Sequence, residues 1–515
     1  MAQLKAKIKD VRGEDRKNTT KSAEQTSQSS ESLKTPQAYR QALAKMKANI
    51  VKDKLVREPC ADKELERGIN VVSVSYEYAQ DPEKKDFMTA QSPLTGKTIH
   101  RYNHIPQSKE DLEKRYEMIN TLAQETFCAQ RCVGSDALYA LFMGTFLVDQ
   151  DKTLNTNYHR RFLEYLKYVQ EKDIAPAGAI TDAKGDRSLA PSDQPERDSY
   201  VHIVKKTEKG VYVSGVKSPI TMGPYAEEIC VLPGRQFAER EKDFAISFAI
   251  PADAEGVTRF VLSPEVKALE GEFSACHGKK YLNKEAMIVF ENVFVPWERV
   301  FLCGEYQYAG RYADFFATVH RFSYCACKPA VFDLLSGVAA LISEYNGTEG
   351  KYLFSDSKGK LFEILKNSDM IRGMGQAAIK FARENESGAV LPDPKYANLG
   401  KFISGAEFPK AISILQDMAG NLPVSLPHEN LLKDKEYGPK VKKVFARKEG
   451  VSPEDHYRLN ELIRTIAASD EGGLLQFGTR HGGGTVEVEK ATIYTQSLKK
   501  LQRCKKMAKR QASID

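Results

Sequence analysis

The segment 320–328 gathers four side chains that can each do chemistry. They are His320, Tyr324, Cys327 and Lys328. Residues three, four and seven apart lie over successive turns of a helix, so a helix here would carry all four on one face. A core stripe would be aliphatic, and a solvated face would be mostly charged. The mixture of imidazole, phenol, thiol and amine therefore marks this face as a candidate site.

A second pair of thiols, Cys128 and Cys132, lies far upstream. Their i, i+4 spacing would place both sulfur atoms on one helical face. With His320 and Cys327 they supply the four ligands that an iron–sulfur cluster or a zinc ion needs. The alternative is that these cysteines are inert, because a free cysteine also packs as a small hydrophobic residue. Cys325 should point off the shared face, and we expect it to be a core thiol.

The candidates for acid–base work are Glu285, His320, Tyr324 and Lys328. Glu285 begins the apolar run 286–290, and partial desolvation there would raise its pKa, as a general base requires. The alternative is a glutamate at a strand end in solvent. Tyr324 and Lys328 could act as proton or hydrogen-bond donors. Gln130, between the two upstream cysteines, is a candidate for a polar wall of the site.

The composition is that of an ordinary globular protein. Of the 515 residues, 41% are hydrophobic and 28% are charged, and the net charge is +7. So small a charge for this length gives no reason to expect nucleic acid. We find no apolar run that approaches the length of a membrane span, and residues 1–10 lack the core of a signal peptide. Nine cysteines without a secretory signal indicate a reducing compartment, and we expect the cytoplasm.

The pattern along the chain predicts an α+β protein with three folded parts. Residues 36–175 show helical periodicity and are expected to form an N-terminal helical domain, with one helical region from about 109 to 148 that contains both upstream cysteines. Residues 176–301 consist of short β-branched runs separated by Gly, Pro and Asp, which predict an antiparallel β-domain. Residues 302–515 return to long helices.

Both ends of the chain are polar. Residues 1–35 have too little apolar surface to offset the entropy of ordering, so we predict a flexible tail. A helix should begin just after it, with Thr35 as N-cap and Pro36 at the first helical position. The segment 499–510 carries seven basic residues. We expect a solvated helix end there, and the alternative is a patch for an acidic cofactor tail or a partner subunit.

Several motifs resemble those of the flavin-dependent 4-hydroxyphenylacetate 3-hydroxylase superfamily, and most of all its 4-hydroxybutyryl-CoA dehydratase family. The motifs are Gln130–Gly134, Thr156–His159, Thr181–Arg187, Glu285–Pro296, His320–Lys328 and His481–Gly484. The resemblance covers roughly residues 36–495. It implies an acyl-CoA dehydrogenase-like fold: an N-terminal helical domain, a middle antiparallel β-domain and a C-terminal helical bundle. It also implies a homotetramer built as a dimer of dimers.

The resemblance further implies a hydro-lyase that acts on a hydroxyacyl-CoA, with an accompanying C=C isomerase activity. The family's ligand positions fall on Cys128, Cys132, His320 and Cys327, which implies a [4Fe–4S] cluster with one iron bound by imidazole. Three thiolates and a neutral imidazole leave such a cluster less anionic, so that iron should be a better Lewis acid. The implied route is α-proton removal, a flavin-mediated radical, and departure of the leaving group to the cluster.

Two loops of the β-rich region are candidates for holding FAD. Residues 181–187 pack donors and a glycine closely, which suits a polar ring edge and a diphosphate. Without the resemblance, a turn with Asx hydrogen bonds is the simpler interpretation. The resemblance places Thr221 against the flavin, and Gly420 in a stretch that reaches a neighbouring subunit's FAD. The predicted flavin-binding residues are Thr181, Lys184, Asp186, Arg187, Thr221 and Gly420.

One position departs from the dehydratase pattern. A second catalytic glutamate of that family lies three residues before the histidine of the C-terminal His-Gly motif, and Gly478 stands at this position here. One alternative is therefore a diverged dehydratase with a different leaving group or acyl chain. A second is a phenol monooxygenase that uses reduced flavin and no cluster. A third is a flavoprotein without catalytic activity.

Overall fold

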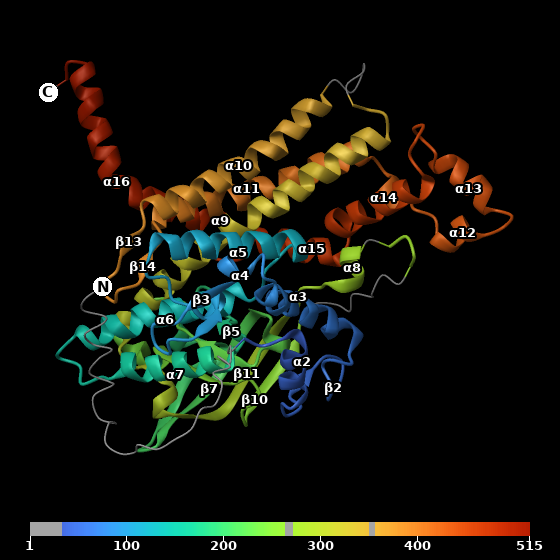
Figure 1. Ribbon diagram of the computed structural model, residues 1–515. Coiled ribbons are helices and arrows are strands. Elements are labelled where there is room, and N and C mark those ends of the chain that lie inside the picture. Colours follow the sequence, from blue (N-terminus) through green and yellow to red (C-terminus); the bar gives the residue numbers. More distant parts are fainter. Residues whose placement is uncertain (1–32, 263–270, 275, 350–355, 515) are drawn as a thin grey trace, which may run out of the picture.

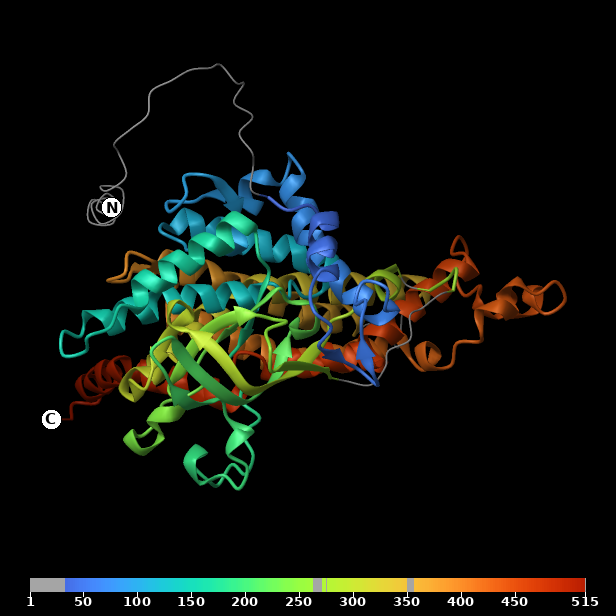
Figure 2. The same cartoon turned by 90° about the horizontal axis from the view of Figure 1, so that it is seen from below.

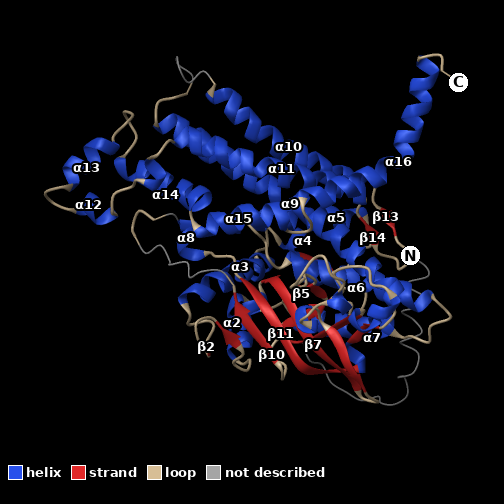
Figure 3. Ribbon diagram, turned by 180° about the vertical axis from the view of Figure 1, so that it is seen from behind, coloured by secondary structure: helices blue, strands red, loops and turns tan. Residues whose placement is uncertain are grey.

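The computed structural model describes residues 33–262, 271–274, 276–349 and 356–514. The strands gather on one side of the molecule and the long C-terminal helices on the other (Figures 1 and 3). Helices come first along the chain, then mostly strands, then helices again. The mixed helical and β content is confirmed, whereas the domain boundaries stay predictions. Most of the predicted flexible tail, residues 1–32, lies outside the described residues.

The N-terminal part is mainly helical. Its helices are α2 (Pro36–Ala44), α3 (Lys63–Gln80), α4 (Lys85–Met88), α5 (Lys109–Thr126), α6 (Cys132–Gln150) and α7 (Tyr158–Lys172), with a hairpin of β3 (Thr89–Gln91) and β4 (Thr98–His100). The Thr35 hydroxyl accepts a hydrogen bond from the Ala38 amide, and Pro36 follows it, so α2 begins as predicted.

The predicted helical region 109–148 is two helices rather than one. Phe127 adopts a left-handed conformation with φ 60° and ends α5, and Gln130 also has positive φ, at 21°. A non-glycine residue in this region cannot continue a right-handed helix. Cys128 therefore lies in a loop and Cys132 is the first residue of α6. The prediction that both thiols share one helical face was wrong.

The strands form two main sheets. One has the order β2-β1-β10-β11-β7-β6, from β1 (Ile50–Val51), β2 (Leu55–Val56), β6 (His202–Lys206), β7 (Gly210–Thr221), β10 (Val257–Val261) and β11 (Glu285–Pro296). The other has the order β12-β9-β8-β5, from β5 (Pro176–Ala179), β8 (Glu228–Val231), β9 (Ile246–Pro251) and β12 (Val300–Cys303). Most neighbours are antiparallel, as predicted. The pairs β1–β10 and β5–β8 are parallel, because β1 joins from far upstream and a long connection precedes β8.

The C-terminal part packs around one long helix. Its elements are α9 (Tyr306–Tyr345), α10 (Ser357–Lys380), β13 (Arg383–Glu384), β14 (Val390–Leu391), α11 (Pro394–Ala419), α12 (Glu429–Lys433), α13 (Gly438–Phe445), α14 (Pro453–Ala468), α15 (Asp470–His481) and α16 (Val486–Gln511). The short helix α8 (Cys276–Lys280) comes earlier, within the β-rich part. Helix α9 contacts α5, α6, α10 and α11. Seen from below, the strands lie in front of these helices (Figure 2).

Helices α6 and α9 are long and apolar enough to cross a membrane by length and composition. The sequence prediction that no apolar run approaches that length was therefore wrong. Their most apolar windows are 78% and 72% buried within the fold, as in core helices. At the far end, α16 projects from the body of the molecule (Figure 1), and its basic residues are exposed, as expected of a solvated helix end.

Candidate active site

Helix α9 carries the four predicted side chains of the segment 320–328 on one buried face. His320, Tyr324, Cys327 and Lys328 are all less than one-tenth exposed. The rings of His320 and Tyr324 meet edge to face with centroids 5.2 Å apart, and the Lys328 Nζ lies 5.2 Å from the Tyr324 centroid. The helical spacing thus places the imidazole, phenol and amine together, as predicted.

The loop between α5 and α6 brings the upstream thiols to this face. The pKa of the Tyr324 phenol is raised first by burial, and Cys327, Cys128 and Cys132 add to the increase, so the three cysteines lie near this ring. Burial raises the pKa of Cys327 to about 11, while the Lys328 ammonium opposes the shift. Buried thiols of this kind are neutral unless a cation joins them.

A buried aspartate, which the sequence analysis missed, orients His320. The His320 Nδ1 lies 2.8 Å from a carboxylate oxygen of Asp136, so the ring donates there and its Nε2 remains free to bind. Asp136 also accepts from Arg115 at 2.6 Å and from Ser323 at 3.0 Å. Ligand atoms of Cys132, Asp136 and His320 lie within 4.8 Å of one another. Asp136 is four residues after Cys132 on α6, a spacing that the sequence does show.

Cys325 points away from this face, as predicted. Its Sγ donates to the Ala397 carbonyl at 3.6 Å, and the residue is fully buried. A Cβ at Gly400 would lie 2.4 Å from that sulfur, so α11 approaches closely because glycine stands there. Cys325 is thus a packing residue between α9 and α11.

Two strands of the six-stranded sheet bring Glu285 close enough to Tyr324 to help raise the pKa of the phenol. Glu285 begins β11 and faces Thr221 at the end of β7. The Thr221 hydroxyl donates a 3.3 Å hydrogen bond to the Glu285 carboxylate. Burial raises the pKa of Glu285, and the bond from Thr221 partly offsets this. The alternative of a strand-end glutamate in solvent is wrong, because the side chain is largely desolvated.

Gln130 is fully buried and fixed from two sides. Its amide group donates to the Asn283 side chain and accepts from the Tyr225 hydroxyl. Tyr225 also accepts from the Lys284 amide at 3.2 Å. The pKa of Tyr225 is raised by burial, and Cys128 and Glu285 add to the increase. Gln130 is therefore buried and held in one position, and its role as a wall of the site stays a prediction.

The segment 478–484 closes over Tyr324. The Tyr324 hydroxyl donates to the Gly478 carbonyl at 2.8 Å. A Cβ at Gly482 would lie 1.9 Å from the Tyr324 oxygen, so this approach requires glycine. At Gly478 itself a Cβ would meet no atom within 4 Å. A larger side chain would therefore fit at the position where the sequence lacks the family's glutamate.

The predicted flavin residues lie in different surroundings. The loop 181–187 is held by Asp182, whose carboxylate pairs at 2.6 Å with the buried Lys217. The Lys217 ammonium also donates to the Ile180 and Leu232 carbonyls. Lys184, Asp186 and Arg187 are exposed, and Thr181 precedes the anchoring aspartate. The Asp186 side chain accepts from Ser188, so the loop also contains the local Asx hydrogen bonds of the simpler interpretation.

Gly420 stands apart from this loop. It ends α11 with φ 70°, and an added Cβ would meet no atom of the described chain within 4 Å. Within one chain the structure therefore does not bring Gly420 into contact with Thr181, Lys184, Asp186, Arg187 or Thr221.

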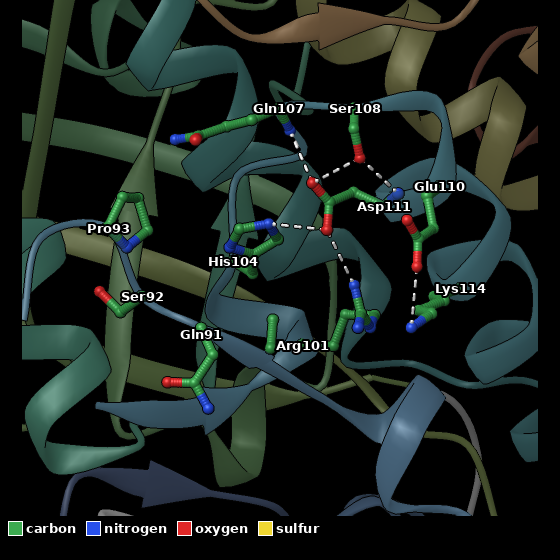
Figure 4. Close-up of a pocket in the computed structure, with 11 residues that line it drawn as sticks. Gln91, Ser92, Pro93, Arg101, His104, Gln107, Ser108, Glu110, Asp111 and Lys114 are labelled. Atoms are coloured by element: carbon green, nitrogen blue, oxygen red, sulfur yellow. Dashed lines mark hydrogen bonds and ion pairs between the residues drawn. The ribbon is translucent and has the colours of Figure 1, made fainter. Parts of the chain in front are cut away.

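A separate surface pocket of about 380 Å³ contains none of the predicted residues (Figure 4). Its polar lining is paired internally. Asp111 lies 3.1 Å from His104 and 3.2 Å from Arg101, and Lys114 lies 3.1 Å from Glu110. Each charged side chain drawn in Figure 4 therefore has a partner of opposite charge within the pocket.

The fold and the site define a helical and β protein in which α6 and α9 carry buried Cys132, Cys327 and His320, near a partly buried strand carboxylate. Two family models match the chain. Residues 35–302 match the 4-hydroxyphenylacetate 3-hydroxylase N-terminal family, and residues 309–513 match its C-terminal family. The chain belongs to the 4-hydroxyphenylacetate 3-hydroxylase family.

Similar proteins include dehydratases and monooxygenases. The 4-hydroxybutyryl-CoA dehydratase/vinylacetyl-CoA-Δ-isomerase of Clostridium aminobutyricum is 35% identical over 90% of this chain and 96% of its own. A solved oxygen-tolerant archaeal 4-hydroxybutyryl-CoA dehydratase from N. maritimus has a TM-score of 0.87 at 34% identity, over 94% of this chain and 95% of its own. The oxygenase component of the Thermus thermophilus 4-hydroxyphenylacetate 3-monooxygenase is 26% identical over 77% of this chain and 81% of its own.

Proposed function

We propose that this protein is a hydro-lyase that eliminates water from a hydroxyacyl-CoA thioester, with FAD and a [4Fe–4S] cluster as cofactors. The observation that carries the proposal is the approach of the Cys132 and His320 ligand atoms to within 4.8 Å of each other, with Cys327 on the same buried face of α9 and Cys128 in the loop just before α6. The identity of 35% to a dehydratase over nearly the whole chain supports it. The monooxygenase relative is less similar, at 26%.

The residues present fit a cluster. Burial raises the pKa values of the Cys132 and Cys327 thiols, so they are costly to ionise unless a metal takes their charge. His320 has one nitrogen committed to Asp136 and the other available, which is the usual arrangement for a metal-bound histidine. Cys128, Cys132, Cys327 and His320 would hold the cluster. When bound, it would supply Lewis acidity toward a leaving hydroxyl.

The residues also fit a flavin between the β-sheet and the helices. Thr221 would lie against the flavin, with the loop 181–187 holding its polar parts. Lys217 supports this assignment because it ties the Asp182 side chain to the sheet and so fixes the loop. The exposed groups of Lys184 and Arg187 would meet the diphosphate, and Gly420 of a neighbouring subunit would complete the site in a homotetramer. FAD would supply one-electron chemistry there.

Each proton transfer is then assigned to a residue of this chain. Glu285 is the general base for the α-proton, since its pKa is raised by burial toward the range in which a base operates. Lys328 would donate to the leaving group or the thioester, and Tyr324 would do so once its hydroxyl turns from the Gly478 carbonyl, to which it donates in this structure. Gln130, fixed by Tyr225 and Asn283, limits the space beside the thiols. Together these buried groups exclude water from the reacting carbons.

Exchange and elimination without oxygen test the proposal. Incubated anaerobically in D2O with a 4-hydroxyacyl-CoA, the holoenzyme should exchange the α-proton and release the unsaturated thioester. His320→Ala should abolish elimination and leave the flavin bound. If such thioesters show neither exchange nor elimination, the dehydratase assignment fails. Hydroxylation of a phenol in air with reduced flavin would instead establish a monooxygenase.

A further inference from the structure

A buried pair of opposite charges lies directly beside Tyr324 and takes no part in the steps above. Lys401 of α11 and Glu489 of α16 are both fully buried. The Lys401 Nζ lies 3.3 Å from a Glu489 carboxylate oxygen and 4.9 Å from the centroid of the Tyr324 ring. Because Lys328 also lies within 5.2 Å of that ring, two ammonium groups flank Tyr324.

The pair holds the chain segment on which the Tyr324 hydroxyl rests. The Lys401 ammonium donates to the carbonyls of Thr479 and Arg480, at 3.2 and 3.5 Å. The Tyr324 hydroxyl donates to the preceding carbonyl, that of Gly478. One ammonium and one phenol therefore contact three consecutive carbonyls at the end of α15, of which the Gly478 carbonyl also accepts the Gly482 amide at 2.9 Å.

Glu489 is the carboxylate on which the charge of Lys401 depends. The charged groups that face Glu489 are Lys401 from α11 and Arg321 from α9. Lys328, further along α9, acts on Lys401 and helps to lower its pKa. Neither carboxylate oxygen accepts a well-directed hydrogen bond among the described residues. Burial raises the pKa of Glu489 to about 7, and burial lowers that of Lys401. The charge state of the pair can thus change near neutral pH.

We propose that Glu489 is a positioning residue of the active site: its ionised carboxylate keeps Lys401 charged, and the charged Lys401 holds the Gly478–Arg480 carbonyls and Tyr324 in place. This inference rests on the proposed function and names a further pair of residues for it. Without the carboxylate, Lys401 would be a buried ammonium with no counter-charge and would lose its proton. A neutral amine donates more weakly, so the end of α15 would loosen.

Substitutions at Glu489 and Lys401 test this role. The quantity measured is the elimination rate of the holoenzyme with a 4-hydroxyacyl-CoA as a function of pH. The wild-type rate should fall as the pH drops through about 7, since the ionised carboxylate is the active form. Glu489→Gln should lower the elimination rate about tenfold at pH 8 and remove the fall near pH 7, while the acidic limb that Glu285 gives remains. Lys401→Met should behave likewise, and Lys401→Arg should retain most activity. If the wild type is active and Glu489→Gln has the same pH profile, the proposed role of the pair is contradicted.

Thermal unfolding of the cofactor-free protein gives a second readout. A carboxyl whose pKa is higher in the folded state than in the unfolded chain stabilises the fold at low pH, and the contribution is lost as the pH rises to that folded pKa. The Tm of the wild type should therefore fall relative to that of Glu489→Gln between about pH 5 and 7.5.

The matched control for unfolding is Glu461→Gln on α14. Glu461 is equally buried and pairs with Arg464, away from Tyr324. The difference in Tm between Glu461→Gln and the wild type over the same pH range is the baseline. If the Glu489→Gln difference changes with pH no more than this baseline does, the charge linkage is refuted. A wild type without any turnover, by contrast, refutes the proposed function itself.

Discussion

Thr221 and Glu285 face each other across β7 and β11, and the threonine hydroxyl donates a 3.3 Å hydrogen bond to the carboxylate. One residue is the predicted flavin neighbour and the other is the predicted base. The pairing register of two strands thus places the proposed flavin contact beside the proposed base. Because the hydrogen bond stabilises the ionised carboxylate, Thr221 lowers the pKa of Glu285 and partly offsets the effect of burial.

The first prediction concerns this pair. Glu285→Gln should slow α-proton exchange by about 10²–10⁴-fold, the usual effect of losing a general base. Thr221→Val removes the group that lowers the pKa of Glu285, so the acidic limb of the exchange profile should move to higher pH. The measurement is exchange in D2O as a function of pH. An unmoved acidic limb in Thr221→Val would show that the hydroxyl does not act on Glu285.

The second prediction concerns the thiols. Anaerobically prepared protein should contain about four irons per chain with brown charge-transfer absorption, and Cys128→Ala or Cys327→Ala should lose both. Cys325→Ala is the matched control, since its sulfur packs against α11 two residues from Cys327. Iron and sulfide analysis of the three variants decides the matter. Zinc, or iron that survives both ligand substitutions, would end the iron–sulfur assignment.

The third prediction concerns Asp136. The isosteric change Asp136→Asn leaves the His320 ring without a charged acceptor for its Nδ1–H. Substituting such a supporting group commonly costs about 10–100-fold in metal affinity, so the variant should lose iron to a chelator faster than the wild type. Ser323→Ala removes a weaker bond to the same carboxylate and should have a smaller effect. Equal rates of iron loss in all three proteins would exclude a role for Asp136.

The fourth prediction concerns FAD. Lys184→Ala and Arg187→Ala should release flavin more readily than the wild type, because each removes an exposed positive charge from the proposed diphosphate loop. Lys505→Ala, in the exposed basic stretch of α16, is the control. Flavin retained after dialysis is the quantity to compare. Equal retention in the three variants would remove the assignment of residues 181–187.

The fifth prediction concerns Gly478. A Cβ there meets no atom within 4 Å, so Gly478→Glu should fold with little strain. If a missing carboxyl limits elimination, the variant should raise the elimination rate about tenfold or more and leave α-proton exchange unchanged. Gly482→Ala should be damaging by comparison, because its Cβ would collide with the Tyr324 hydroxyl. An unchanged elimination rate in Gly478→Glu would mean that another group already supplies this proton.

Local spacing in the sequence determined one half of the site. The positions 320, 324, 327 and 328 share a face because helix geometry depends only on neighbouring residues, and α9 is continuous across them. The same reasoning placed Cys325 off that face. It also placed Glu285 at the start of an apolar strand and a helix start at Thr35.

Only the tertiary structure decided the other half of the site. The spacing of Cys128 and Cys132 suggested a single helix, but Phe127 and Gln130 take positive φ in the loop that brings both thiols to α9. Asp136 and His320 are 184 residues apart in sequence, and their contact depends on how α6 packs against α9. Lys401 and Glu489 come from two further helices. Such contacts have no local signature, because they are set by packing between elements that are distant along the chain.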